Sequence, residues 1–264
     1  MKIPTLLYLM ASIMLLMIPP AFSNQNPKPE DTEVWDPEPM VVIPGDYSTS
    51  GAPSDAIILF DGSSLSAWQK PPINPEVGKE MDPDYENKPA DWDVIDGEMV
   101  VKQRTGAIET KQAFGDMQLH IEWMTPYAEG KKGQGYSNSG IFLMSFYEIQ
   151  VLNSYENRTY SNGQAGSIYK QHIPLVNACR KPGDWQFYDI IFKAPVFDKE
   201  GSLKSTARIT AFHNGVLIHN HVELIGPTVF IGTPNYVTHP AKLPLRLQDH
   251  GDPVRYRNIW VRKL

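Results

Sequence analysis

The sequence predicts an all-β fold, most simply a jelly-roll sandwich of two antiparallel sheets. Apolar and polar residues alternate with a period of two from Ile57 onward, as along residues 117–124. Asp96-Gly97 and Asn214-Gly215 are two-residue hairpin signals between such runs. No stretch of helical length shows both the apolar periodicity and the capping residues of an amphipathic helix. Many short strands joined by tight turns favour a sandwich over other all-β folds.

Three of the expected strands alternate most clearly, and they cover residues 117–124, 147–152 and 245–250. Further strands are expected at residues 57–60, 92–95, 98–101, 139–144, 187–193, 207–213, 216–222 and 254–262. Residues 40–43 are a candidate edge strand in front of the domain.

Composition excludes several classes of protein. The chain has 264 residues, of which 41% are hydrophobic, enough for one domain with a full core. Its net charge of −6 argues against nucleic-acid binding through a basic face. The one cysteine, Cys179, cannot form an internal disulfide or a Cys-rich zinc site. No phosphate loop or dinucleotide fingerprint is present, so we expect no nucleotide cofactor.

The N-terminus has the pattern of a cleavable signal peptide over residues 1–23. Lys2 precedes an apolar run from Leu6 to Ile18, and Ala21-Phe22-Ser23 fits a cleavage site. We therefore expect export, to the periplasm or the medium, with an uncleaved anchor as the alternative. No cysteine lies near the cleavage point, so a lipoprotein anchor is not expected. Residues 24–56 are Pro-rich and acidic and predict a tether or strap, and residues 57–264 predict the folded domain.

The polar faces of the three clearest strands carry hydrogen-bonding and titratable side chains in place of the usual Lys and Thr. These are Gln118, His120, Glu122, Glu148, Gln150, Arg246, Gln248 and His250. If the strands are neighbours in one sheet, these side chains converge on a curved surface suited to a polyol. The sequence therefore favours a sugar-binding groove over an ordinary solvated sheet face.

Several segments resemble the DUF1080 family in order along the chain. Leu59–Trp68 (LFDGSSLSAW) resembles its opening motif, and Trp92–Met99 (WDVIDGEM) its first hairpin. Leu247–Gly251 (LQDHG) and Arg257–Trp260 (RNIW) resemble its C-terminal signature. Such matches extend from residue 59 to residue 264.

The resemblance implies a concanavalin-like sandwich and an exported enzyme of 3-keto-glucosides, either a 1,2-lyase or a 3-keto-2-hydroxy-glucal hydratase. In that chemistry a ketone at C3 acidifies the C2 proton, a base removes the proton, and the C1 substituent leaves by β-elimination. The substrate is then a 3-keto-glucoside or a related glycoside. A separate oxidoreductase is expected upstream, because this chain lacks a nucleotide site.

Four residues are the candidate catalytic groups: His120, Glu122, Glu148 and His250. A carboxylate or imidazole can act as general base or acid, and the four together could hold a divalent metal ion. No spacing among them is a strong metal motif. The alternative for each is an ordinary surface or structural side chain.

Five further residues are candidates for binding substrate: Asn138, Gln150, Lys170, Gln248 and Arg257. Amides suit hydroxyl groups, and Lys170 or Arg257 could hold a keto or enolate oxygen. A structural ion pair is an equal interpretation for Arg257.

Two other functions remain open at this point. A conventional glycoside hydrolase would use two carboxylates on an unoxidised substrate. A non-catalytic lectin-like sandwich would use the same fold for binding alone.

Overall fold

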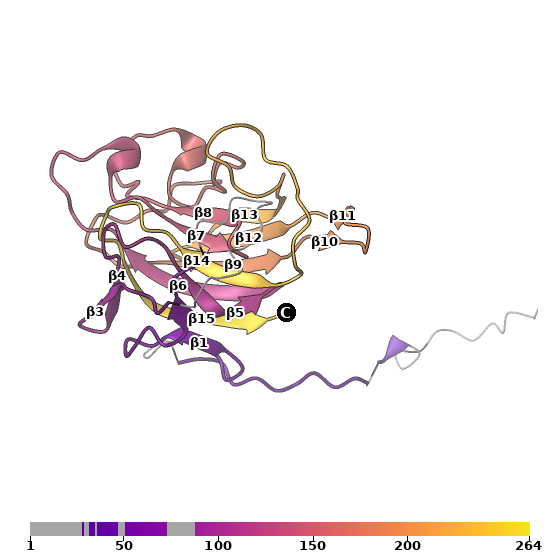
Figure 1. Ribbon diagram of the computed structural model, residues 1–264. Coiled ribbons are helices and arrows are strands. Elements are labelled where there is room, and N and C mark those ends of the chain that lie inside the picture. The colour runs from indigo at the N-terminus through magenta and orange to yellow at the C-terminus, as the bar shows by residue number, and fades with distance from the viewer. Residues whose placement is uncertain (1–27, 29–31, 35, 47–50, 73–87) are drawn as a thin grey trace, which may run out of the picture. The chain divides into compact units, whose positions relative to one another are not determined.

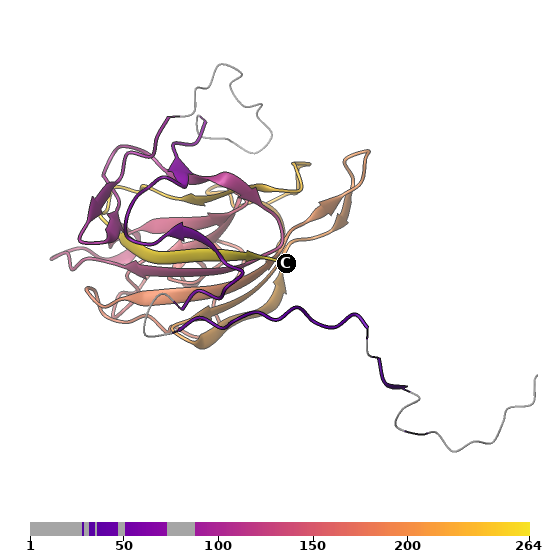
Figure 2. The same cartoon turned by 90° about the horizontal axis from the view of Figure 1, so that it is seen from below.

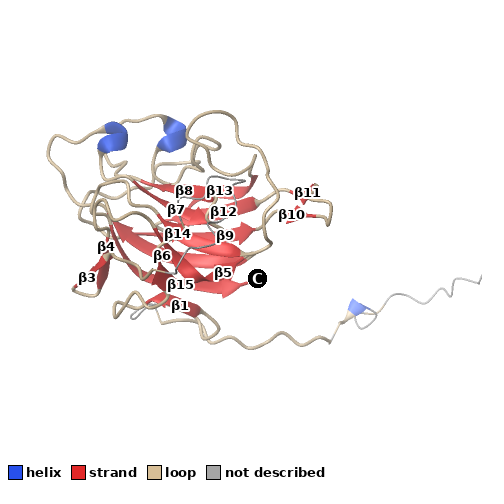
Figure 3. Ribbon diagram, viewed as in Figure 1, coloured by secondary structure: helices blue, strands red, loops and turns tan. Residues whose placement is uncertain are grey.

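Strands dominate the computed structural model, which describes residues 28, 32–34, 36–46, 51–72 and 88–264 (Figure 1 and Figure 3). The expected signal peptide, residues 1–23, lies outside the described residues. The chain divides into two units, Met1–Val41 and Val42–Leu264. Within the described residues, no helix is long and apolar enough to cross a membrane.

The larger sheet has eight antiparallel strands within the described part of the chain. Its order is β13 (Val216–Glu223), β12 (Arg208–His213), β9 (Gln186–Lys193), β6 (Met117–Met124), β15 (Arg255–Lys263), β4 (Glu98–Val100) and β3 (Asp93–Ile95), with β1 (Ile57–Phe60) also paired to β15.

The smaller sheet has five antiparallel strands among the described residues. Its order is β2 (Trp68–Gln69), β5 (Ile108–Phe114), β14 (Leu243–Leu247), β7 (Ser139–Leu143) and β8 (Tyr147–Val151). A two-stranded ribbon, β10 (Val196–Phe197) and β11 (Leu203–Ser205), and the short 3-10 turns η2 (Gly133–Gly135) and η3 (Ser161–Gly163) complete the described elements.

The two sheets lie face to face (Figure 2). The side chains between them form one hydrophobic core, as the period-two pattern requires. Along β6 every second side chain is buried, and Leu119 and Ile121 are completely inaccessible. Ile149 of β8 and Leu245 of β14 enter the same core from the other sheet. The predicted all-β sandwich is therefore confirmed.

Several details differ from the strands expected from sequence, and the short strands β2, β10 and β11 were not predicted. β5 was not predicted, because its first three residues are all buried and break the alternation. β14 ends at Leu247, so His250 lies beyond the strand in an exposed position. The candidate edge strand at residues 40–43 is wrong, since no strand includes these residues and Met40 is 76% exposed.

Core packing on β6 gives a direct test of the sandwich. Leu119→Ala is expected to lower the free energy of unfolding by about 2–5 kcal/mol, because it leaves a cavity between the sheets. Ile191→Ala on the neighbouring strand β9 is the control, since Ile191 is 44% exposed and its loss should cost under about 1 kcal/mol. Urea unfolding of both variants measures the difference, and equal costs would contradict this core.

Candidate functional site

The structure separates the sequence-predicted site residues onto two different sheets. His120 and Glu122 lie on β6 and Arg257 on β15, both in the larger sheet. Glu148 and Gln150 lie on β8 in the smaller sheet. The residues that alternate with them along each strand are buried between the two sheets. Successive side chains of a strand point to opposite faces, so these polar side chains point outward, on opposite sides of the sandwich. The expectation of a single converging surface is therefore wrong.

The four residues considered as metal ligands cannot surround one ion, because His120 and Glu122 are on one sheet and Glu148 and His250 are on the side of the other. In the part of the chain that the structure describes, no group of three or more His, Cys, Asp or Glu side chains could hold a metal ion. The donor set expected for a mixed oxygen and nitrogen site does not form.

The smaller sheet carries a groove of about 1060 Å³ on its outer face. Its polar lining comes mainly from β8, β14 and the segments that follow or precede them. The lining includes Asn138, Phe142, Glu148, Gln150, Tyr160, Tyr169, Phe230, Arg246, Gln248 and His250. Five of the predicted site residues, Asn138, Glu148, Gln150, Gln248 and His250, thus meet in one place.

Glu148 lies deep in this groove with 5% of its surface exposed. Among the described residues no donor forms a hydrogen bond to its carboxyl group, and burial raises its pKa to about 8. The carboxyl group rests on Gly140 of β7, where an added Cβ would lie 2.5 Å from Glu148 Oε1. The glycine makes room for a carboxyl group that titrates near neutral pH.

Arg246, which lines the same groove, forms a buried ion pair with Glu109 on the adjacent strand. Arg246 Nη2 donates to Glu109 Oε2 at 3.1 Å, and the two residues are register partners of β14 and β5. Among the described residues, Arg246 Nε is buried without a hydrogen-bond partner, and so is Gln248 Oε1. Because buried polar atoms are nearly always paired, these two groups in the groove lining indicate a ligand that supplies their partners.

Asn138 and Gln150 are held by hydrogen bonds to each other and to the backbone. Gln150 Nε2 donates to Asn138 Oδ1 at 2.9 Å and to Ser139 O at 3.1 Å. Asn138 Nδ2 donates to Gln134 O at 3.0 Å. Both amides are thus fixed in orientation before any ligand arrives.

Lys170 stabilises the aromatic rim of the groove. Its Nζ donates to Phe230 O at 2.5 Å and lies 4.4 Å from the centre of the Phe230 ring. Tyr160 and Tyr169, which share a hydrogen bond of 2.8 Å, lie close to the same ammonium group. The ammonium group of Lys170 therefore interacts with the aromatic residues of the rim.

Sequence reasoning gave no role to several residues of this groove. Arg246 was predicted on the polar, outward face of an expected strand, but it was given no individual catalytic or binding role. Glu109 lies on β5, whose irregular burial gave no strand signal. Tyr160, Tyr169 and Phe230 come from loops, where no periodicity exists to indicate a face.

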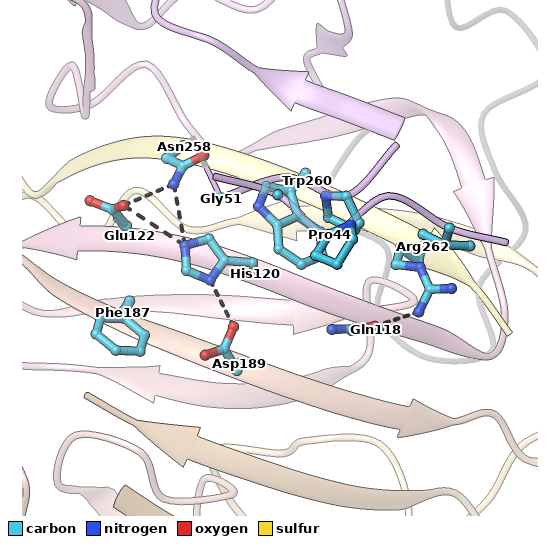
Figure 4. A pocket seen from close by; sticks show the side chains of 13 residues that line it. Pro44, Gly51, Gln118, His120, Glu122, Phe187, Asp189, Asn258, Trp260 and Arg262 are labelled. Carbon is cyan, nitrogen blue, oxygen red and sulfur yellow. Dashed lines mark hydrogen bonds and ion pairs between the residues drawn. The ribbon is translucent and has the colours of Figure 1, made fainter. Parts of the chain in front are cut away.

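A second polar cluster occupies the outer face of the larger sheet (Figure 4). His120 Nδ1 lies 2.7 Å from Asp189 Oδ1, and His120 Nε2 lies 3.8 Å from Glu122 Oε1. Burial lowers the pKa of His120, but hydrogen bonds to these two carboxylates outweigh it and raise the pKa to about 9. His120 is therefore an imidazolium at neutral pH.

Glu122 is held from three sides. Besides His120, Asn258 Nδ2 donates to its Oε1 at 2.9 Å and Arg257 Nε donates to its Oε2 at 2.6 Å. Burial raises its pKa, yet these hydrogen bonds prevail and lower the pKa to about 2. The Arg257 guanidinium also lies 4.0 Å from the centre of the Trp185 ring. Arg257 thus forms an ion pair on the larger sheet, outside the groove of Glu148.

The two glutamates should affect stability in opposite directions. The pKa of Glu148 is raised from 4.5 in the unfolded chain to about 8 in the folded chain, so folding stability is lost as pH rises from 4.5 towards 8. Glu148→Gln is expected to match the wild type near pH 4 and to exceed it by roughly 3 kcal/mol at pH 7. Urea unfolding at the two pH values measures this gain.

Glu122→Gln is the matched control on the opposite face. Its lowered pKa contributes stability that is present above pH 4.5 and lost as pH falls towards 2, so this variant should be less stable than the wild type at pH 7. A Glu148→Gln protein that is no more stable than the wild type at pH 7 would contradict a raised pKa at Glu148.

Comparisons with known proteins agree with this fold. The sequence matches the family described as 3-keto-alpha-glucoside-1,2-lyase-like domain over residues 55–262. A candidate glycosyl hydrolase from Parabacteroides distasonis, known from a crystal structure, is 46% identical, with 90% of this chain and 97% of that chain covered and a TM-score of 0.80.

A second candidate glycosyl hydrolase from the same organism is 16% identical, with 80% of this chain and 94% of that chain covered and a TM-score of 0.54, and it shares the fold alone. A comparison with curated proteins gave no match. The family match covers most of the chain and includes both sheets of the sandwich. The chain therefore belongs to the 3-keto-alpha-glucoside-1,2-lyase-like domain family.

Proposed function

We propose that the protein is a carbohydrate-active enzyme whose active site is the groove of the smaller sheet. We propose further that it cleaves 3-keto-glucosides by elimination, with Glu148 transferring the proton. The observation that carries this proposal is that Glu148 is the only carboxylate among the described residues that line the groove. Its pKa of about 8 allows it to accept and return a proton near neutral pH.

A single carboxylate suits elimination better than conventional glycoside hydrolysis. Ordinary glycosidases place two carboxyl groups on either side of the scissile bond. Here Glu109 is tied to Arg246 at 3.1 Å and is not part of the groove lining, which leaves Glu148 alone. A substrate with a ketone at C3 needs one base at C2, because the ketone stabilises the carbanion.

The proposed steps balance as follows. Glu148 takes the C2 proton, and the C2–H electrons pass into an enolate on the C3 oxygen. The enolate then forms the C1=C2 double bond and expels the C1 oxygen substituent, which takes up the proton held by Glu148 and so regenerates the carboxylate. Addition of water at C1 of this enone, in the hydratase direction, gives the free 3-keto sugar. The sum of both steps is hydrolysis of a 3-keto-glycoside.

Arg246 and Gln248 are proposed to contact the substrate at the groove floor. The unpaired Arg246 Nε suits the oxygen that becomes negative in the enolate, since a buried, oriented guanidinium donates strongly to an anion. Gln248 Oε1 suits a sugar hydroxyl. Asn138 and Gln150 form the polar wall, and His250 lies at the exposed edge of the groove.

The proposal also covers the location of the protein and the reaction that supplies its substrate. We propose that the protein is exported to the periplasm or the medium, supported by the signal-peptide pattern of residues 1–23. A separate oxidoreductase would convert the C3 hydroxyl group of a glucoside to the ketone, because elimination needs that ketone in its substrate.

The test compares a 3-keto-glucoside with its unoxidised parent, using the purified protein and following products by NMR and ultraviolet absorbance. The oxidised substrate alone should be consumed, giving the enone or the free 3-keto sugar. Glu148→Gln should lower kcat by about 100-fold or more, the usual loss when a proton-transfer group is removed. Glu223→Gln, on the exposed edge strand β13 of the other sheet, should keep wild-type activity.

Three outcomes would overturn the proposal. Turnover of the unoxidised glycoside would assign conventional hydrolysis. Sugar binding without turnover of either substrate would assign a lectin-like function. Full activity of a folded Glu148→Gln protein would remove Glu148 from the mechanism.

A further inference from the structure

We infer that the outer face of the larger sheet carries a second, non-catalytic binding site, and that its ligand is an uncharged sugar unit. The site is a cavity of about 520 Å³ over β6, β9 and β15, and its lining also includes Val42, Pro44, Gly45, Gly51 and Pro53 (Figure 4). This volume is within the range of small-molecule pockets, about 300–1000 Å³. The inference does not depend on the proposed reaction.

The charges around this cavity cancel in pairs. His120 pairs with Asp189 at 2.7 Å, and Glu122 pairs with Arg257 at 2.6 Å. Arg262 holds Asp55 through two hydrogen bonds of 2.7 Å each. With every charge matched, the site offers little net attraction to an ion, whether a phosphate or a metal cation.

The same groups present a dense set of oriented donors and acceptors. Asn258 donates to Glu122 at 2.9 Å, and Arg262 Nη1 donates to Gln118 Oε1 at 2.9 Å. Asn258 has a φ of 46°, in the left-handed region, at a break in the β6–β15 register, which turns its side chain towards Glu122 and His120. Planar polar groups that are already fixed by their neighbours suit the hydroxyls of a neutral polyol.

Aromatic rings supply the apolar part of the cavity. Trp260 stacks on His120 with 5.2 Å between ring centres, and Phe187 lies on the other side of that imidazole at 5.8 Å. Trp260 is 5% exposed and its indole nitrogen has no hydrogen-bond partner among the described residues. A sugar uses both kinds of surface, the ring face against an aromatic side chain and a hydroxyl oxygen as partner for an N–H donor.

The hydrophobic core lies between this cavity and the groove of Glu148, so the two sites can be tested independently. The probe is methyl α-D-glucoside, and the readout is the NMR signals of the His120 imidazole and the Trp260 indole N–H. Saturable shifts of both signals are expected in the wild type and in Glu148→Gln. Asp189→Ala should weaken this binding at least 10-fold, because it frees His120 to turn.

Asp93→Ala is the matched control, an outward-facing aspartate on β3 of the same sheet, and it should bind like the wild type. If Asp189→Ala does not fold, Gln118→Ala removes an acceptor from the same cavity and serves in its place. The inference is overturned if the sugar leaves both signals unchanged, if the shifts disappear in Glu148→Gln, or if inorganic phosphate produces them and the sugar does not.

Discussion

Face-to-face packing of the two sheets is the constraint on which both polar surfaces depend. On every strand of the sandwich one set of side chains must enter the core, and the alternate set must then point outward. Leu119 and Ile121 are completely buried on β6, and Ile149 is completely buried on β8. His120 and Glu148 consequently face away from each other with the core between them.

Hydrogen bonds through the core support the groove from beneath. Tyr256 OH of β15 and Ser139 Oγ of β7 share a bond of 2.7 Å, and Tyr188 OH of β9 donates to Gln150 O at 2.8 Å. These tyrosines are fully buried, so each needs a partner within the protein. The partners that they find are on β7 and β8, the strands that carry Gly140 and Glu148. The larger sheet thus helps to fix the groove without contributing to its lining.

The two surfaces use burial in opposite ways. On the larger sheet His120 and Glu122 each have a partner of opposite charge, and their pKa values move apart so that both are ionised at neutral pH. In the groove, Glu148 is buried and no described residue donates to its carboxyl group, which makes its ionised form costly. A paired cluster suits positioning and binding, whereas a solitary buried carboxyl group is poised to exchange a proton. Such a group lowers stability, and the large shared core offsets that cost.

The sequence by itself determined the strands, the hairpins and the outward direction of most site residues. Strands β6, β8, β9, β12, β13 and β15 follow from alternation that is local to each segment. It gave no signal for β5, since Glu109 and Thr110 are buried beside Ile108 and interrupt the alternation. Only the tertiary structure decided which strands are neighbours, because pairing joins residues far apart in the chain, as in the partnership of Arg246 with Glu109. The strand pairing placed His120 and Glu148 on different sheets. The surroundings of each side chain, rather than its residue type, then favour the charged form of His120 and the neutral form of Glu148.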